Sequence, residues 1–151
     1  MNNLPINTLY YLIETLGILA FALSGFMLAK KKDFDIVGIY SVAWITAFGG
    51  GTLRDVILDI QPVYWIDHAE YPLLLLLLII PLNLFKSLSI KPIWLFVPDA
   101  IGMSLFAITT AQTAYDAGHP TIIVAILATI VATFGGVIRD SICQEIPIIF
   151  Q

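Results

Sequence analysis

Charged residues are scarce in this chain. They make up 12% of its 151 residues, whereas 59% of the residues are hydrophobic and the mean hydropathy is +0.92. A soluble domain carries about 25% charged residues. The polar sequence is therefore too sparse to cover a surface that faces water, and the composition predicts an integral membrane protein with a lipid bilayer as its surroundings.

The sequence also lacks the residues that support several other functions. Cys143 is the single cysteine, which excludes a disulfide framework and a cysteine-based metal site. Seven Lys and Arg residues form no extended basic patch, so nucleic acid is not an expected partner. The chain contains no Ser–His–Asp arrangement, no phosphate-binding glycine loop and no His-Glu-x-x-His motif. We therefore expect no enzyme activity, no catalytic residues, no metal or other cofactor, and no soluble partner.

Five apolar stretches are long enough, or nearly so, to cross a bilayer core of about 30 Å, which requires roughly 20 helical residues. They are residues 9–29, 36–60, 71–85, 93–114 and 121–143. The third stretch is short unless it begins near Val63. The first follows no basic segment of the kind that opens a signal peptide, so we expect it to be retained. The predicted fold class is an all-α, polytopic helical bundle.

Lysines mark alternate loops between these stretches. Lys30, Lys31 and Lys32 follow the first stretch, and Lys86 and Lys91 follow the third. The other loops carry acidic residues and no Lys or Arg: Asp59, Asp67, Glu70 and Asp116. Because loops rich in Lys and Arg remain in the cytoplasm, we predict that the N-terminus is outside and that the Lys30–Lys32 loop is cytoplasmic.

The sequence matches itself when it is shifted by 85 residues without a gap. The strongest matches are Gly17/Gly102, Phe21/Phe106, Gly50/Gly135, Gly51/Gly136, Arg54/Arg139, Asp55/Asp140 and Pro62/Pro147. One copy spans three helices, and because three is odd, consecutive copies enter the membrane from opposite sides. This is an inverted-topology repeat, which places a functional site near the bilayer midplane where the repeats meet.

We assign residues 1–92 to the first inverted repeat and residues 93–151 to the second. The counterpart of the third stretch would begin near position 156, beyond Gln151. The second repeat is therefore expected to be incomplete, or truncated, in this chain.

Glycines interrupt the second and fifth stretches near their midpoints: Gly49, Gly50 and Gly51 in one, Gly135 and Gly136 in the other. Glycine allows another helix backbone to approach closely. It also permits a kink whose freed carbonyl groups need water, an ion or a side chain. Both roles remain open, and they are compatible with each other.

Charged residues within the apolar stretches need partners, because an unpaired charge in lipid is costly. Adjacent Arg54 and Asp55 project about 100° apart on a helix, which argues against their being each other's main partner. Depth in the membrane predicts two symmetry-related ion pairs, Glu14–Arg54 and Asp99–Arg139. Asp55 and Asp140 would then be free to face a polar cavity or another subunit. A purely structural role, in which all these groups hold the repeats together, is the alternative.

Two copies of Gly-Gly-x-x-Arg-Asp in an inverted three-helix repeat resemble the prokaryotic trimeric intracellular cation channels, bacterial membrane proteins that also carry a "glycine transporter" domain name. The resemblance covers essentially the whole chain. It implies seven helices, a homotrimer in the bacterial inner membrane, and one water-filled, potassium-permeable pore per subunit. It further implies that Gly49–Gly51 and Gly135–Gly136 form kinks that shape this pore. Phe134 stands where a third glycine would complete the second copy.

Three functions remain open at this point. The leading hypothesis is a passive channel for potassium or another monovalent cation, with the pore between helices two and five. The second is a secondary transporter of a small amino acid such as glycine, because inverted repeats and central glycines suit it equally well. The third is a membrane scaffold that transports nothing and has no continuous water path.

Overall fold

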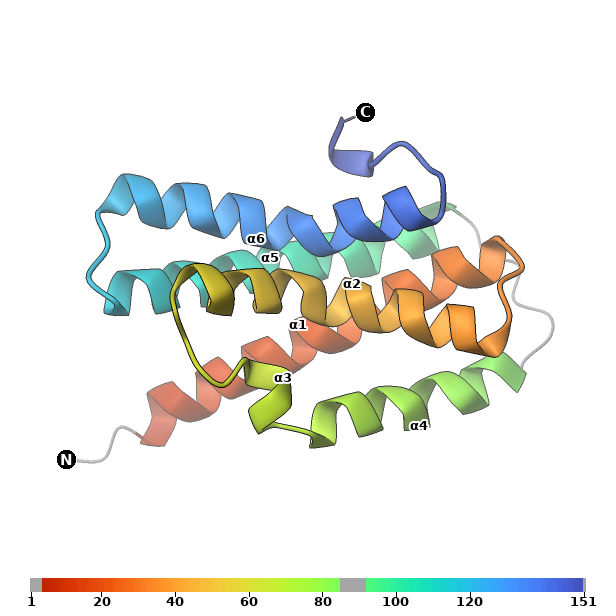
Figure 1. The fold of residues 1–151 in the computed structure, drawn as a ribbon, viewed down its shortest axis with the longest axis horizontal. Helices are drawn as coiled ribbons and strands as arrows, with labels where there is room; N and C mark the ends of the chain where they lie inside the picture. The colour runs from red at the N-terminus through yellow and green to blue at the C-terminus, as the bar shows by residue number, and fades with distance from the viewer. Residues whose placement is uncertain (1–3, 85–91, 151) are drawn as a thin grey trace.

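The computed structural model describes residues 4–84 and 92–150, and these form an all-helical bundle. Figure 1 shows the long helices lying side by side along one axis. The elements are α1 (Leu4–Lys31), α2 (Ile36–Ile57), α3 (Tyr64–Asp67), α4 (Glu70–Leu84), α5 (Pro92–Asp116), α6 (Thr121–Ile142) and a final 3₁₀ turn, η1 (Ile148–Phe150).

Within the described residues, four helices are long and apolar enough to cross a membrane: α1, α2, α5 and α6. The helix in the third predicted stretch, α4, has 15 residues, fewer than a perpendicular crossing requires. A break at His68 and Ala69 separates it from α3, so it does not extend back to Val63. The second stretch is also shorter than we expected, because α2 ends at Ile57 rather than near residue 60.

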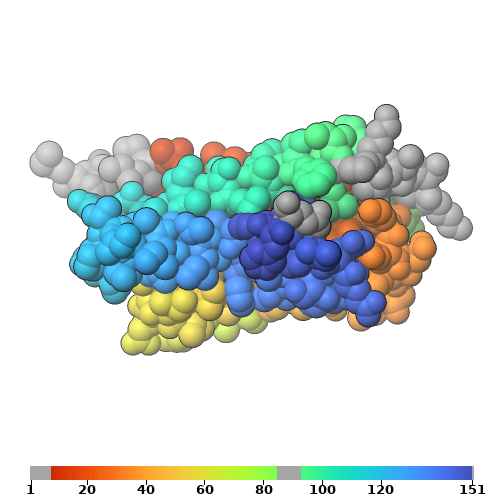
Figure 2. Space-filling model, turned by 90° about the horizontal axis from the view of Figure 1, so that it is seen from above, coloured from red at the N-terminus to blue at the C-terminus, as the bar shows by residue number. Residues whose placement is uncertain are grey.

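The four long helices form a closed ring. Helix α1 packs against α2 and α5, and α6 packs against the same two helices from the other side. Helix α4 lies outside this ring against α2 and α1. Figure 2, turned by 90° from Figure 1, shows the side of the bundle opposite α4, where α5 and α6 lie open and the segment after α6 folds back onto α6. The core of the ring is apolar and includes Ile18, Phe21, Phe106 and Val131, each at most 2% exposed.

The turns that end the helices recur 85 residues apart. After α1, Asp33 takes a left-handed φ of 56°, and after α5 Gly118 does so with a φ of 81°. After α2 and α6 the left-handed residues are Asp59 and Gln144, with φ values of 53° and 55°. A left-handed residue after the last helical turn is a common helix stop, because it lets the next N–H groups bond back to free carbonyls. Two equivalent helix–turn–helix units therefore face each other.

The contacts between these units are reciprocal. A Cβ atom on Gly17 would lie 2.9 Å from Phe106 Cδ2, and one on Gly102 would lie 2.6 Å from Phe21 Cδ1. The two phenylalanine rings are 5.2 Å apart between centroids. Each ring thus occupies the space left by the glycine of the other unit, as expected where a surface meets a copy of itself.

Each end of the bundle brings together loops that the charge pattern assigns to one side of the membrane. At the end where α2 and α5 finish, Asp67 and Asp116 line one cleft. At the other end, Lys32 Nζ lies 2.7 Å from Glu145 Oε1 and Lys30 Nζ donates to the Asn83 carbonyl oxygen at 2.9 Å. Lys86 and Lys91, which also entered the orientation prediction, lie outside the described residues.

Candidate functional site

The paired glycines mark the place where α2 crosses α6. A Cβ atom on Gly50 would lie 2.6 Å from the Val131 carbonyl oxygen, and one on Gly135 would collide with the carbonyl oxygen of Thr46. Positions 46 and 131 are themselves 85 residues apart, so this crossing is reciprocal too. Both helices continue through their glycines without interruption. Close helix packing, one of the two roles considered for these glycines, is therefore present, and neither helix is broken there.

The remaining glycines of these motifs lie in less crowded surroundings. A Cβ atom on Gly49 would be 3.8 Å from Ile138 Cδ1, and one on Gly51 would be 3.5 Å from Phe106 Cε1. A Cβ atom on Gly136 would be 3.6 Å from Asp99 Oδ1 and 3.7 Å from Arg139 Nη2. Gly51 thus faces both the core and the Arg54 guanidinium, whereas the nearest neighbours of Gly136 are charged groups.

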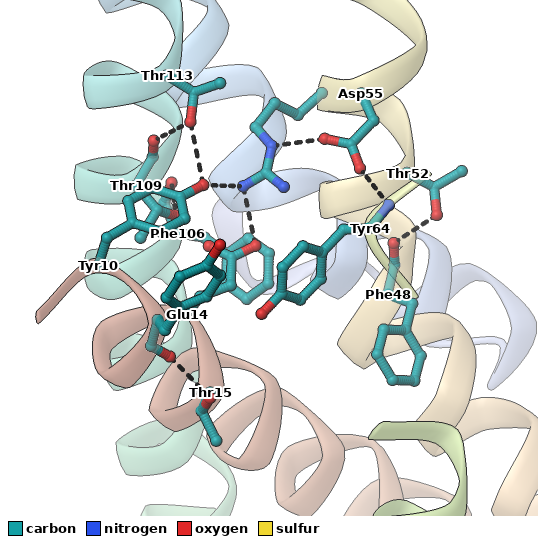
Figure 3. A network of polar contacts seen from close by, with 12 residues as sticks. Tyr10, Glu14, Thr15, Phe48, Thr52, Asp55, Tyr64, Phe106, Thr109 and Thr113 are labelled. Carbon is teal, nitrogen blue, oxygen red and sulfur yellow. Dashed lines mark hydrogen bonds and ion pairs between the residues drawn. The ribbon is translucent and has the colours of Figure 1, made fainter. Parts of the chain in front are cut away.

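Arg54 is the centre of a buried polar cluster between α1, α2 and α5. Figure 3 labels four of the other members, Tyr10, Glu14, Asp55 and Thr113. The Arg54 Nη1 atom lies 2.9 Å from Glu14 Oε1 on α1 and donates to the Tyr10 hydroxyl at 3.4 Å. The Tyr10 hydroxyl is in turn 3.1 Å from Thr113 Oγ1 on α5. Arg54 is 2% exposed and Glu14 is 1% exposed. The structure therefore brings together the first pair predicted from depth in the membrane.

A second cluster surrounds Arg139 between α1, α5 and α6. Its Nη1 atom forms an ion pair with Asp99 Oδ1 and donates to the Ser24 hydroxyl on α1, which bonds to the same carboxylate oxygen at 3.2 Å. Arg139 is fully buried and Asp99 is 3% exposed. The second predicted pair is therefore also brought together.

The expectation that Asp55 and Asp140 are free is wrong. Arg54 Nε donates to Asp55 Oδ1 at 2.8 Å, and Arg139 Nε donates to Asp140 Oδ1 at 2.7 Å. The other oxygen of each carboxylate accepts a backbone N–H from the segment that follows the helix, Tyr64 at 2.8 Å and Ile148 at 3.1 Å. Both aspartates therefore tie a returning segment to the helix end.

Each arginine can bond to both carboxylates because of the shape of its side chain. The guanidinium presents five N–H donors in a fixed fork. In both clusters Nε is bonded to the adjacent aspartate, while the distal Nη1 is bonded to the carboxylate on the neighbouring helix. The 100° separation of neighbouring residues excludes a face-to-face pair but does not exclude this short lateral bond.

Sequence reasoning missed several members of these clusters. Tyr10, Ser24 and Thr113 were not singled out, although each bonds to a predicted charge or to its partner. The only signal for Tyr10 is its position one helical turn before Glu14. Nothing in the sequence distinguishes Ser24 from the other hydroxyl residues of the membrane segments.

Some buried polar atoms of the described residues have no hydrogen-bond partner. They are Glu14 Oε2, Thr110 Oγ1 and Arg139 Nη2. Two of the three belong to the charge clusters, where such an atom is costly in a low-dielectric interior unless water reaches it. Both clusters therefore have unused capacity to bind water or another polar group.

Each cluster adjoins hollow space. A cleft of about 470 Å³ reaches Arg54 and Asp55 from the end of the bundle that carries Asp67 and Asp116. At the opposite end, a cleft of about 180 Å³ reaches Asp140 and is lined by Lys31 and Glu145. A smaller pocket of about 80 Å³ adjoins Asp99, Gly136 and Asp140.

Tyr64, which lines the larger cleft, remains an uncharged hydrogen-bonding group. Burial raises its pKa, and so does the hydrogen bond from its hydroxyl to the Tyr71 hydroxyl at 3.0 Å. The Tyr71 hydroxyl is 2.9 Å from Thr15 Oγ1 on α1, so this chain of hydroxyls connects the segment after α2 to α1 and α4.

These features define a multi-pass helical membrane protein built around two buried arginine–carboxylate clusters. The chain belongs to the family described as "Glycine transporter", whose sequence profile matches residues 11–86 and 96–151. Its relatives are membrane proteins rather than enzymes.

Two curated relatives belong to bacteria. The chain is 34% identical to the UPF0126 membrane protein YvgT of Bacillus subtilis, over 93% of this chain and 70% of that protein. It is 32% identical to the UPF0126 inner membrane protein YadS of Escherichia coli K12, over 95% of this chain and 70% of that protein.

A solved structure has the same fold. It is the TRIC trimeric intracellular cation channel orthologue from Rhodobacter sphaeroides, with a TM-score of 0.88 and 34% identity. The match covers 95% of this chain and 75% of that protein. The resemblance inferred from the Gly-Gly-x-x-Arg-Asp motifs is therefore confirmed.

Proposed function

We propose that this chain is the subunit of a homotrimeric channel that conducts monovalent cations, potassium among them, passively across the bacterial inner membrane. Each subunit would contain its own pore, between α2 and α6 and bordered by the two arginine clusters. The observation that carries the proposal is the likeness to the Rhodobacter cation channel at a TM-score of 0.88 with 34% identity.

The charge balance of the clusters supports a path for cations. Each cluster sets two carboxylates against one guanidinium, Glu14 and Asp55 against Arg54, and Asp99 and Asp140 against Arg139. With all groups ionised, each cluster carries a formal charge of −1. Carboxylates in a pore favour cations over anions. The arginines therefore do not oppose cation entry, because each is outnumbered.

The two clusters lie toward opposite ends of the bundle, and each adjoins a cleft that opens at its own end. This arrangement suits a path that enters from both sides and is narrowest near the α2–α6 crossing. The N-terminus would be outside, with the Lys30–Lys32 turn in the cytoplasm, as the lysine distribution predicts.

A secondary transporter of a small amino acid such as glycine is the second candidate. The family description favours it, and so does the 470 Å³ cleft, because its lining includes the carboxylates Asp67 and Asp116 as well as Arg54. An amino acid needs both kinds of group, one for its ammonium and one for its carboxylate.

Flux measurements separate these functions. The chain would be reconstituted in sealed liposomes, and potassium efflux would be measured beside uptake of radiolabelled glycine, with protein-free liposomes as the control. We expect potassium efflux that does not saturate and no concentrative glycine uptake. In planar bilayers under a potassium chloride gradient, the reversal potential should lie close to the potassium equilibrium potential.

Each other outcome has a definite meaning. Saturable glycine uptake without potassium leak would replace the channel with the transporter. A reversal potential at the chloride equilibrium potential would contradict cation selectivity. If neither potassium efflux nor glycine uptake is detected, the channel and the transporter are both contradicted and the membrane scaffold is the remaining hypothesis. Native mass spectrometry in detergent should show three copies of the chain, and a monomer would contradict the proposed assembly.

A further inference from the structure

The two units of the bundle contain equivalent pockets that differ greatly in size. One pocket adjoins Glu14 and has a volume of about 10 Å³, and the other adjoins Asp99 and has a volume of about 80 Å³. We call them the Glu14 pocket and the Asp99 pocket. Six lining positions correspond at the 85-residue spacing: Glu14/Asp99, Ile18/Met103, Phe48/Thr133, Gly51/Gly136, Thr52/Val137 and Tyr64/Ile149.

Aromatic side chains account for the difference. Phe48 lines the Glu14 pocket and is 3% exposed, and its equivalent in the Asp99 pocket is Thr133. The Phe48 ring lies 5.4 Å from the Trp44 ring and 6.4 Å from the Trp65 ring, and the two tryptophan rings are 4.8 Å apart. Trp65 is held in place because its Nε1 donates to Thr52 Oγ1 at 3.1 Å.

The second unit has no such group of rings. The position equivalent to Trp44 is Thr129, and the Thr133 hydroxyl bonds back to the Thr129 carbonyl oxygen at 2.9 Å rather than filling the pocket. The position equivalent to Trp65 is Phe150, which is 72% exposed. Equivalent helix positions therefore enclose a filled pocket in one unit and an open one in the other.

We propose that Trp44, Phe48 and Trp65 form an aromatic plug that restricts the access of water and ions to the Glu14 pocket, whereas the Asp99 pocket stays open to them. Phe48 is the residue that decides this. The Glu14 pocket has room for about one water molecule, and Glu14, whose Oε2 is buried without a hydrogen-bond partner, is one of its lining residues. The plug thus leaves the carboxylate in reach of a single water molecule.

Any effect of the plug on ion flux rests on the proposed channel function, but the accessibility of the two pockets to water does not. Accessibility can be tested without flux, by thiol labelling at the equivalent apolar positions Ile18 and Met103. Ile18→Cys and Met103→Cys would each be made in a Cys143→Ser chain in sealed liposomes. Both would be exposed to aminoethyl methanethiosulfonate, a small cationic reagent, and modification would be followed by mass spectrometry.

A buried thiol is inert whereas one reached by water reacts, so we expect the Met103→Cys thiol to react at least about tenfold faster than the Ile18→Cys thiol. Adding Phe48→Thr, the residue that the other unit already has at this position, should raise the rate at Ile18→Cys toward that at Met103→Cys. Phe48→Leu is the matched control, because it keeps an apolar side chain in the pocket, and it should leave the rate low.

Potassium efflux from the liposomes is the second measurement. Phe48→Thr should raise potassium efflux severalfold, and Thr133→Phe should lower it. Equal reactivity at the two cysteines, or no effect of Phe48→Thr on the Ile18→Cys thiol, would overturn the plug. If the labelling behaves as expected but no form of the chain conducts potassium, the plug stands and the proposed channel function fails.

Discussion

Gly50 of α2 lies directly against the Val131 carbonyl oxygen of α6, with only 2.6 Å between that oxygen and the position that a Cβ atom on Gly50 would occupy. The contact leaves no space for a side chain, and its obstacle is backbone, which cannot rotate aside. Gly51, the next residue, differs, because a Cβ atom there would meet two side-chain atoms at ordinary contact distance, Phe106 Cε1 at 3.5 Å and Arg54 Nη2 at 4.0 Å. Position 51 therefore has space for an alanine side chain, and position 50 does not.

Gly50→Ala is expected to destabilise the bundle by about 1–3 kcal/mol, because the added methyl group forces α2 and α6 apart. Gly135→Ala should do the same through Thr46. Gly51→Ala is the control, since alanine favours a helix by about 1 kcal/mol over glycine and the site accepts the methyl group. Thermal unfolding in detergent measures all three. Equal melting temperatures for Gly50→Ala and Gly51→Ala would contradict the close crossing.

Removing one partner of a buried ion pair should be much worse than removing both. Glu14→Gln and Arg54→Gln are each expected to cost about 3–5 kcal/mol, because the remaining charge stays buried without its partner. The Glu14→Gln/Arg54→Gln double variant should cost clearly less than the sum of the two single changes. Unfolding free energies of the four proteins form the double-mutant cycle. Strict additivity would show that the two side chains do not interact.

The second pair offers an independent check. Asp99→Asn and Arg139→Gln should give a coupling of the same sign, since the geometry of the cluster repeats. We expect Ser24→Ala to weaken that second cluster only, because the Ser24 hydroxyl bonds to both Arg139 and Asp99. An effect of Ser24→Ala on the Glu14–Arg54 coupling would contradict this separation.

The Lys32–Glu145 pair should make stability depend on pH. Lys32 lowers the pKa of the Glu145 carboxyl by hydrogen bonding and by its charge. Its stabilising contribution is therefore complete above the ordinary glutamate pKa of about 4.3 and is lost as the pH falls through the lower pKa of the folded protein. Melting temperatures of the unchanged chain and of Glu145→Gln should differ at pH 7 and converge toward pH 3. A difference that persists at pH 3 would show that the carboxylate charge is not its cause.

The orientation in the membrane can be read from labelling. In a Cys143→Ser chain expressed in cells, Asp67→Cys and Asp116→Cys should react with an impermeant maleimide from outside, because both positions line the same cleft. Lys31→Cys should react only after the membrane is opened. Labelling of Lys31→Cys in intact cells would reverse the orientation, and labelling of only one aspartate position would contradict their common side.

Much of the fold could be predicted from the positions of residues along the chain. Apolar length predicted the helices, and the 85-residue spacing predicted which residues are equivalent. Depth along the helices was enough to pair Glu14 with Arg54, because two charges at one level in lipid have few other partners. These properties depend on position along the chain alone.

The remaining features depend on rotation about each helix and on what folds back against it. Asp55 is bonded to Arg54 and to the Tyr64 N–H only because the segment after α2 returns to that helix end. Phe48 and Thr133 occupy equivalent positions, yet the ring fills a pocket that the threonine leaves open. The sequence by itself determined the four long helices and the 85-residue spacing that relates their glycines and charges. The tertiary structure decided which side chains share each level and which pocket is filled, since these follow from packing in three dimensions.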